Sequence, residues 1–284
     1  MFKYCLYKFG QFIVRCLPLK LAYRFAVFMS DMQYRFSPRD RKAVTNNLKA
    51  ILPDCDHVQV LAREVFRNFG RYLLEFFRMT KFMNQEYIQK NVTIKNLECI
   101  ERVLKYGKGG ILLTAHIGNW ELGGVIISML GYPVMAVALP HKERPVNDLF
   151  NSQREARGVK VVQTDGAIRK CIEALKHNGI VALLADRDFG LNGEIMDFLG
   201  KKALIPKGPA AFSLKTGAPI FPVFLIRKND DHFMLTFEEP LFPLGEGTET
   251  EKLLSLMKQY TAVIEKKIYE NPTQWLMFRE FWIK

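Results

Sequence analysis

The sequence contains no uninterrupted run of about 18 apolar residues, so it gives no clear transmembrane helix. No small-residue cleavage site follows the N-terminal apolar stretch, which makes it a poor fit to a cleaved signal peptide. The 5 cysteines are scattered and without C-x-x-C spacing, which argues against a disulfide framework and indicates reduced cytosolic thiols. Internal repeats, low-complexity tracts and domain linkers are also missing. The chain of 284 residues is therefore expected to form one large domain.

Apolar and basic residues are abundant. Apolar types make up 49% of the chain and aromatic types 12%, so a sizeable core is expected and disorder is not. The formal charge of +12 favours an anionic partner: a nucleic acid, an anionic membrane surface or an acidic carrier protein. A nucleic acid is the weakest of these, because the cations are dispersed and no recognition motif is present.

The N-terminal segment, residues 1–35, mixes apolar and cationic positions and has no acidic residue before Asp31. Apolar side chains fall near one helical face, at Leu6, Phe9, Ile13 and Leu17. Cations are spread between them, at Lys3, Lys8, Arg15, Lys20 and Arg24. This pattern predicts an amphipathic helical segment lying in a membrane interface. An ordinary amphipathic helix packed on its own domain, or a short tilted span, would show a similar pattern.

The remaining residues, 36–284, predict an α/β domain. A helix begins at Pro38 after Ser37 and continues to Pro53, and a longer helix with a phenylalanine stripe follows. Strands are then expected at 111–115, 133–139, 159–163, 180–185, 219–226 and 232–237. Helices are expected at 120–131, 145–156, 167–177 and 249–269. This alternation predicts a largely parallel central sheet flanked by helices.

The stretch from Gly109 to Gly124 carries the strongest functional signal. Its apolar run is typical of a buried strand, which places His116 at the carboxyl end, where open α/β sheets bind ligands. Asn119 is a good N-cap for the helix that follows, and Glu121 lies in its first turn. A structural interpretation, with His116 in the core and Glu121 facing the helix dipole, prevails on the bare spacing alone.

The functional interpretation is general-base catalysis. A neutral imidazole at His116 can take a proton from a substrate hydroxyl, while the Glu121 carboxylate fixes the tautomer of the ring. The hydroxyl then attacks an acyl carbonyl, so no protein nucleophile is needed. We expect no metal, because this spacing lacks the i,i+4 histidine pair that zinc would require.

The block His116-Ile-Gly-Asn-Trp-Glu121 resembles the H-x-G-N-W-E block of the lipid A biosynthesis (lauroyl/myristoyl) acyltransferases. These belong to the lysophospholipid and glycerolipid acyltransferases, which share an H-x4-D/E motif. The resemblance extends to Pro272-Thr-Gln-Trp275. It implies a glycerolipid acyltransferase-like fold, His116 as base with Glu121 as its partner, and no cofactor. It also implies transfer of a fatty acyl chain from acyl carrier protein, or coenzyme A, to a lipid A precursor on the cytoplasmic face of a bacterial inner membrane.

Further candidate residues follow from the resemblance. Asp186 and Asp188 match a D-x-D/Q-x-G-like block and would position sugar hydroxyls of the acceptor or brace His116, with Asp186 the better candidate. A charged loop with an Asp–Arg ion pair is the structural alternative. Arg154, with Arg157 as a fallback, matches an arginine that would bind a phosphate. A solvated charge on a helix is nearly as good an interpretation of either arginine.

The segment from Lys201 to Pro209 resembles one that helps to bind the phosphate of the acceptor. Lys207 supplies charge, and Gly208 begins a helix whose amides favour anions, although a basic surface loop would look the same. Asn119 is a further candidate for substrate binding. Phe278 departs from the polar residue common in lipid A enzymes, so a lysophospholipid or a phosphatidylinositol mannoside remains an alternative acceptor. A basic peripheral membrane-binding protein is the non-enzymatic alternative.

Overall fold

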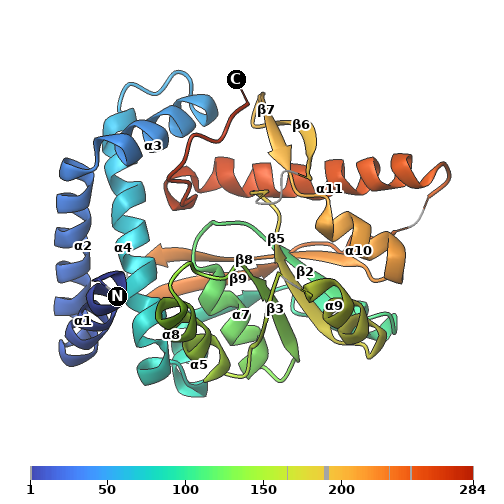
Figure 1. Ribbon diagram of the computed structural model, residues 1–284, viewed down its shortest axis with the longest axis horizontal. Helices are drawn as coiled ribbons and strands as arrows, with labels where there is room; N and C mark the ends of the chain where they lie inside the picture. The colour runs from blue at the N-terminus through green and yellow to red at the C-terminus, as the bar shows by residue number, and fades with distance from the viewer. Residues whose placement is uncertain (1, 165, 189–191, 230, 244, 284) are drawn as a thin grey trace.

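A seven-stranded sheet with the order β1-β9-β8-β2-β5-β3-β4 forms the centre of the computed structural model (Figure 1). The structure describes residues 2–164, 166–188, 192–229, 231–243 and 245–283. The strands are β1 (Val92–Lys95), β2 (Gly110–Thr114), β3 (Val134–Ala138), β4 (Lys160–Gln163), β5 (Ile180–Leu184), β8 (Ile220–Asn229) and β9 (His232–Phe237). All neighbours pair in parallel except β8 and β9. The predicted α/β class with a largely parallel sheet is confirmed.

Helices cover both faces of the sheet. One face packs against α4 (Val58–Phe82), α5 (Gln85–Asn91), α6 (Glu98–Lys105), α7 (Trp120–Met129) and α8 (Arg144–Glu155). The other packs against α9 (Ala167–Lys176), α10 (Gly208–Thr216) and α11 (Glu249–Glu270), which is followed by the short helix η1 (Pro272–Gln274). The alternation of side chains along β2 explains the division, because Leu112 joins the first cluster whereas Ile111 and Leu113 join the second.

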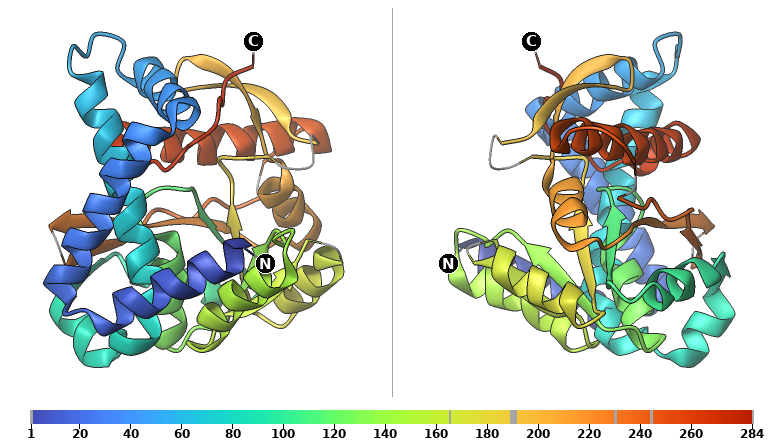
Figure 2. Two further views of the ribbon diagram at one scale, coloured as in Figure 1. Left: turned by 60° about the vertical axis from the view of Figure 1, so that its left-hand side comes forward. Right: turned by 90° about the vertical axis from the view of Figure 1, so that its right-hand side faces the viewer.

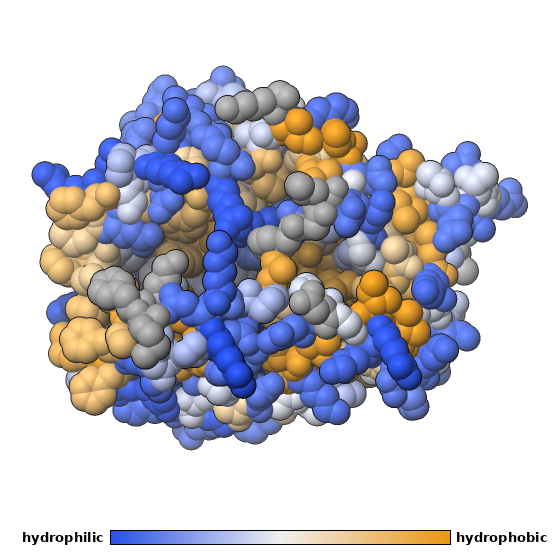
Figure 3. Space-filling model, viewed as in Figure 1, coloured by the Kyte–Doolittle hydropathy of each residue, from blue (hydrophilic) through white to orange (hydrophobic). Residues whose placement is uncertain are grey.

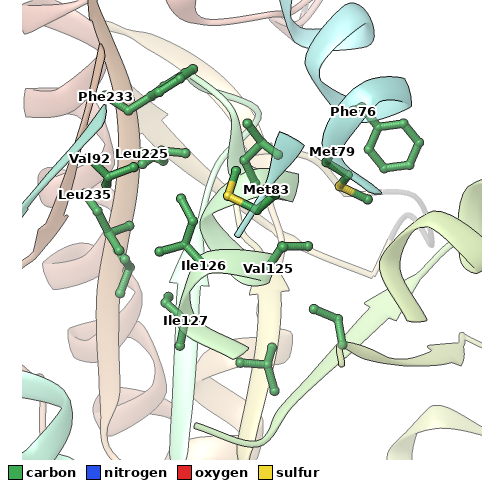
Figure 4. Close-up of a cluster of buried hydrophobic side chains, with 14 of the residues drawn as sticks. Phe76, Met79, Met83, Val92, Val125, Ile126, Ile127, Leu225, Phe233 and Leu235 are labelled. Carbon is green, nitrogen blue, oxygen red and sulfur yellow. The ribbon is translucent and has the colours of Figure 1, made fainter. Parts of the chain in front are cut away.

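The first cluster is the core between the sheet and helices α4 and α7. Figure 4 shows Val125, Ile126 and Ile127 of α7 within this cluster. Leu225 and Leu235 of the sheet lie on one side of them, and Phe76 and Met79 of α4 lie on the other. All three α7 side chains are inaccessible to solvent. Their burial fixes α7 on the sheet and with it the turn that leads from β2 into α7.

The N-terminal segment forms two helices, α1 (Phe2–Cys16) and α2 (Leu19–Phe36), with α3 (Pro38–Ile51) following. Helices α1 and α2 both pack along α4. Helix α1 also contacts α8, so the N-terminal segment lies beside the α/β body (Figure 2). At the crossing of α2 and α4, a Cβ on Gly70 would overlap the Ser30 hydroxyl, which shows how closely the two backbones approach. Asp31 of α2 also accepts hydrogen bonds from Arg63 and Arg67 of α4.

No helix within the described ranges combines the length and the apolar character needed to cross a membrane. Helix α2 ends at Phe36, and the division of the chain near residue 36 stays a prediction. The assignment of residues 1–35 to a membrane interface stays a prediction.

The structure adds elements that the sequence pattern did not predict. Strands β6 (Glu194–Phe198) and β7 (Lys201–Ile205) pair as an antiparallel hairpin, and β7 lies within the segment from Lys201 to Pro209 that was expected to bind a phosphate. Its turn places Leu199 and Gly200 at φ values of 49° and 76°, the positive values that a two-residue hairpin turn requires. Leucine is an unusual residue there, so the sequence carried no Asn-Gly or Asp-Gly signal. Strand β1 and helix α6 were also not predicted.

Candidate active site

The site is assembled where β2 and β5 end side by side. These strands pair in parallel with Thr114 opposite Leu184, and the Ala185 amide donates to the Thr114 carbonyl at 2.9 Å. Each strand is followed after one further residue by a polar side chain, His116 on one and Asp186 on the other. The register alone therefore brings together two residues that are 70 positions apart in the sequence.

Asp186 is fully buried and holds the imidazole of His116 in place. Its Oδ1 lies 2.8 Å from the His116 Nδ1, and its Oδ2 accepts from the His116 backbone N–H at 2.9 Å. The indole N–H of Trp275 donates to the same Oδ2, also at 2.9 Å. Burial alone would raise the pKa of Asp186, but the His116 imidazole and the three N–H donors hold that pKa below its usual range.

This arrangement decides which nitrogen of the ring can act as a base. A carboxylate that stays ionised near neutral pH can only accept hydrogen bonds, so Nδ1 of His116 carries the proton. The other nitrogen, Nε2, is then left with its lone pair. The His116 side chain keeps 17% of its surface exposed and lines a cavity. The geometry is that of a general base oriented by a buried carboxylate.

Glu121 binds Arg154 and does not orient the imidazole of His116, as the sequence had predicted it would. Its two carboxylate oxygens accept from Nε and Nη2 of Arg154, at 2.8 and 2.6 Å. The orienting position on His116 is taken by Asp186 instead, because Asp186 leaves the adjacent strand whereas Glu121 points from the first turn of α7 toward α8. Both His116 and Glu121 nevertheless line the same cavity, and Arg154 lines it too.

The turn from His116 to Asn119 is clamped through its backbone. The Gly118 amide donates to the carbonyl of Gln274, the last residue of η1, at 3.0 Å, and the Leu276 amide, just after η1, donates to the His116 carbonyl at 2.7 Å. The Asn119 amide donates to the Leu225 carbonyl of β8 at 2.9 Å. Gly118 adopts a φ of 62°, and a Cβ there would overlap that same carbonyl oxygen. Glycine is therefore required at this position both by the backbone angle and by the space.

Asn119 is confirmed as the N-cap of α7, since its Oδ1 accepts from the Leu122 amide at 3.1 Å. Its Nδ2 donates to Glu75 at 2.7 Å, and the residue is only 2% exposed. Both ends of the amide are therefore already engaged. Asn119 is not among the residues that line the cavity, and its part in substrate binding stays a prediction.

The cavity has a volume of about 350 Å³ and is polar at one end and apolar along its length. The polar end carries His116, Glu121, His141, Arg154 and Arg187. The apolar walls come from β2, β3, β5, α7 and α8, and include Leu112, Gly124, Val134, Ala136, Phe150 and Ala182. Val134 is paired with Ile180, which is paired with Gly110 at the start of β2. The cavity thus follows the strands for up to about 20 Å from the His116 end.

Burial perturbs the charged groups at the polar end. Burial lowers the pKa of His141, and the nearby Arg154 charge lowers it further. The pKa of Arg187 is also lowered, first by burial and then by the like charge of Arg279. Burial alone would lower the pKa of Arg154, yet the Glu121 carboxylate holds it above its usual value. This end of the cavity therefore combines a neutral imidazole with fixed positive charge.

The other predicted residues lie outside the set that lines the cavity. Arg157 donates to the Thr80 carbonyl and ties α8 to α4. Asp188 accepts from the Gly193 amide at 2.6 Å, beyond the end of β5. Lys207 lies 3.5 Å from Glu194, and Gly208 begins α10 on the opposite face of the sheet. Residues of β6, β7 and α10 share the second core cluster with α11.

Several residues in and around the site were not identified as site residues from the sequence. Trp275 is 3% exposed and donates a hydrogen bond to Asp186, so it belongs to both the site and the core. Arg187 stands between the two acids that the sequence did single out. His141, Gln274 and Glu75 carry no local motif. Within the described part of the chain, no group of three or more His, Cys, Asp or Glu side chains is placed to hold a metal ion.

Comparison with known proteins identifies the family to which this chain belongs. The model of the bacterial lipid A biosynthesis acyltransferases matches residues 1–284. A phosphatidylinositol mannoside acyltransferase of Mycolicibacterium smegmatis is 27% identical over 98% of this chain and 90% of its own length. A lipid A biosynthesis acyltransferase of Haemophilus influenzae is 23% identical over 96% of this chain and 89% of its own. The solved 1-acyl-sn-glycerophosphate acyltransferase PlsC of Thermotoga maritima aligns over 89% of this chain and 99% of its own with a TM-score of 0.43 and 16% identity.

Replacement of Gly118 by alanine tests the clamp on the turn. Gly107 is a matched control, because it also has a positive φ, 76°, but a Cβ there meets nothing within 4 Å. We expect Gly107→Ala to lower the free energy of unfolding by about 1–2 kcal/mol, the usual cost of the left-handed conformation. Gly118→Ala should cost clearly more, because a backbone carbonyl must also move. Equal losses in urea unfolding would show that the turn is not held against β8.

Proposed function

We propose that this enzyme acylates a glycolipid hydroxyl. The chain belongs to the bacterial lipid A biosynthesis acyltransferase family and is therefore an enzyme that transfers acyl groups. The donor is a fatty acyl thioester carried by acyl carrier protein, and the acceptor is a lipid A precursor at a membrane surface. One observation carries the proposal. The Asp186-oriented imidazole of His116 lines the polar end of a cavity whose remaining walls are apolar.

The chemistry follows from that geometry. Nε2 of His116 removes the proton of the acceptor hydroxyl, and the oxygen attacks the thioester carbonyl carbon to form a tetrahedral intermediate. Asp186 stabilises the imidazolium that results, since it is already an ionised acceptor at Nδ1. The positive charge of Arg187, which lines the same end, favours the developing oxyanion. Collapse breaks the carbon–sulfur bond, and the imidazolium returns its proton to the leaving thiolate.

The Glu121–Arg154 pair does not take the proton, which is the role of His116, but forms part of the cavity wall in this proposal. Its side chains are 11% and 12% exposed, and they form a rigid polar wall beside the imidazole. The Arg154 guanidinium also lies over the Phe76 ring, 5.9 Å from its centre. The pair keeps the polar end of the cavity open. It also presents the edges of a carboxylate and a guanidinium group to the head group of the acceptor.

The donor and the site of action follow from charge and exposure. A net charge of +12 would attract an acidic carrier protein and an anionic lipid surface alike. Exposed apolar side chains on α1 and α2 form what we call the N-terminal apolar surface: Leu6, Phe9, Phe12, Leu21, Phe28 and Met29. Figure 3 shows apolar residues gathered over these helices, at the left edge of the molecule. We propose that this surface enters the cytoplasmic leaflet of the inner membrane.

A second acceptor has specific support. The phosphatidylinositol mannoside acyltransferase is the more similar of the two full-length relatives, at 27% against 23% identity. Phe278 also packs against Phe66 and Phe69 with ring centres 4.8 and 4.9 Å apart, so this position offers an acceptor no polar group. A phosphatidylinositol mannoside is therefore the alternative acceptor for the same chemistry.

The orienting carboxylate gives the direct test of the mechanism. Asp186→Asn keeps the shape but removes the charge that holds the Nδ1 proton, so kcat should fall by about 10²- to 10⁴-fold, the range of a general acid–base group. His116→Ala should fall at least as far. Transfer from palmitoyl or lauroyl carrier protein is followed by mass spectrometry of the lipid product, with lipid A precursor and phosphatidylinositol mannoside offered separately.

Asp197→Asn is the control for the same chemical change, since Asp197 lies on the exposed face of β6 and pairs with Lys202 at the surface. It should retain wild-type turnover. Acylation of the mannoside alone would replace the first acceptor by the second. Near-normal turnover by His116→Ala, or no transfer to either lipid by the wild type, would refute the proposal.

The apolar length of the cavity predicts a limit on acyl chain length. Gly124 of α7 lines this length, and a Cβ there meets nothing within 4 Å, so a larger side chain projects into free space. Gly124→Ala and Gly124→Leu should shift the preference stepwise toward shorter donors in competition assays with mixed chain lengths. Turnover of the shortest donors serves as the internal control and should be retained. An unchanged preference in Gly124→Leu would place the acyl chain elsewhere.

The N-terminal apolar surface predicts membrane binding through specific side chains. Phe9 and Phe12 are 63% and 66% exposed. Replacing both by serine should weaken flotation with vesicles that contain anionic phospholipid by roughly tenfold or more, because two large apolar groups are lost. The matched control replaces Ile168 and Ile195, each 63% exposed on α9 and β6, by serine. Equal weakening in both variants would show that α1 has no special part in binding.

A further inference from the structure

Glu75 is a carboxylate buried in the middle of α4, and the proposed reaction does not use it. It has no exposed surface, and three donors from three different elements surround it. Its Oε1 accepts from the Tyr23 hydroxyl of α2 at 2.9 Å and from the Arg227 guanidinium of β8. Its Oε2 accepts from the Asn119 side-chain amide at 2.7 Å. Glu75 thus connects α2 and β8 with the residue that begins the helix after His116.

Stability alone gives no reason for a charged pair at this depth. Removing two charges from water is costly, and a buried ion pair can often be replaced by apolar side chains without loss of stability. What apolar side chains cannot supply is an acceptor for the amide of Asn119. The Arg227 guanidinium, which lies over the rings of Phe233 and Tyr23 at 4.7 and 5.7 Å, forms an ion pair with Glu75, and both carboxylate oxygens of Glu75 accept hydrogen bonds.

Asn119 connects Glu75 to the turn from His116 to Asn119, which we call the catalytic turn. Its Nδ2 can reach Glu75 only while its Oδ1 faces the Leu122 amide, so Glu75 selects the orientation in which the amide caps α7. The backbone N–H of Asn119 is bound to Leu225, and His116 lies three residues earlier in the same turn. The position of the His116 backbone is thus fixed by Asp186 at one end of the turn and by Glu75, through Asn119, at the other.

We propose that Glu75 is a positioning residue for acyl transfer, and that its hydrogen bond to Tyr23 makes the geometry of the catalytic turn depend on the seating of α2. This inference rests on the proposed function for the reaction that it positions. Helix α2 has its outer face in the N-terminal apolar surface, through Leu21, Phe28 and Met29, while Tyr23 reaches inward to Glu75. The same short helix therefore contacts both the proposed lipid surface and the buried carboxylate.

Tyr23→Phe tests the link, with Tyr34→Phe as the matched control. Tyr34 also lies on α2 and also donates its hydroxyl to α4, to Gln59 Oε1 at 2.9 Å, but Gln59 has no bond to the catalytic turn. We expect Tyr23→Phe to lower kcat roughly tenfold with KM for donor and acceptor nearly unchanged. Amide hydrogen exchange of the full-length protein should become faster in peptides covering 116–123 and stay unchanged elsewhere. Tyr34→Phe should alter neither measurement.

A second variant separates positioning from neutralisation of charge. Glu75→Leu combined with Arg227→Met removes both charges together, so no unpaired charge remains buried. We expect kcat to fall by about 10²-fold, the cost of a misplaced catalytic group, and exchange at 116–123 to rise. The urea midpoint should fall only by the cost of the Tyr23 and Asn119 donors that lose their acceptor, and less than in Glu75→Leu alone, which also leaves the Arg227 charge buried without its carboxylate. Wild-type kcat in this double variant would show that Glu75 only balances Arg227.

The exchange measurement needs no substrate, so it distinguishes this inference from the proposed function. Unchanged exchange at 116–123 in both Tyr23→Phe and the double variant would overturn the positioning role even if the enzyme acylates lipid as proposed. Faster exchange throughout the chain in Tyr23→Phe would also overturn it, since the hydroxyl would then serve general stability. Local loosening at 116–123 in a wild-type protein that lacks acyl transfer would refute the reaction and leave the Tyr23–Glu75–Asn119 link supported.

Discussion

Asp186 makes three hydrogen bonds in a position that solvent does not reach, and two of them are to one residue, His116. The contact exists because β2 and β5 are neighbours in parallel register, so that two polar residues leave the sheet edge together. It requires Trp275, and hence the segment after α11, to close over the carboxylate. The direction of the His116 ring, the nitrogen that faces the cavity and the ionisation of Asp186 all follow from this one buried contact.

The rest of the molecule holds that contact from several sides. The segment after η1 and strand β8 bind the backbone of the turn, and α7 is fixed by its buried apolar face. A second buried carboxylate, Glu75, acts on the far end of the turn through Asn119. Polar groups thus converge at the carboxyl edge of the sheet, while the apolar walls of the cavity extend along the strands. The two ends suit an alcohol and a thioester at one end and a hydrocarbon chain along the other.

Much of this arrangement could be predicted from the sequence. The strands near 111–115 and 180–185, the helices around them and the Asn119 cap are each specified by local pattern, and the structure confirms them. Glu121 was predicted as the partner of His116 from the H-x4-E spacing, and Asp186 only as one that would bind the acceptor or brace His116. The structure shows the contact to Asp186, which depends on strand order and not on local spacing. Glu75 and Trp275 act through contacts between distant elements. Glu75 has no local motif, and the Pro272-Thr-Gln-Trp275 block marks Trp275 without showing that it bonds to Asp186.

The protonation of one ring measures the central claim most directly. In protein labelled with ¹⁵N at histidine, the two ring nitrogens of His116 can be assigned by comparison with His116→Ala and followed near pH 8. The account predicts a neutral ring with the proton on Nδ1, hydrogen-bonded to Asp186, and an unprotonated Nε2 available as base. A neutral ring with its proton on Nε2 would contradict it, because such a ring has no basic nitrogen facing the cavity.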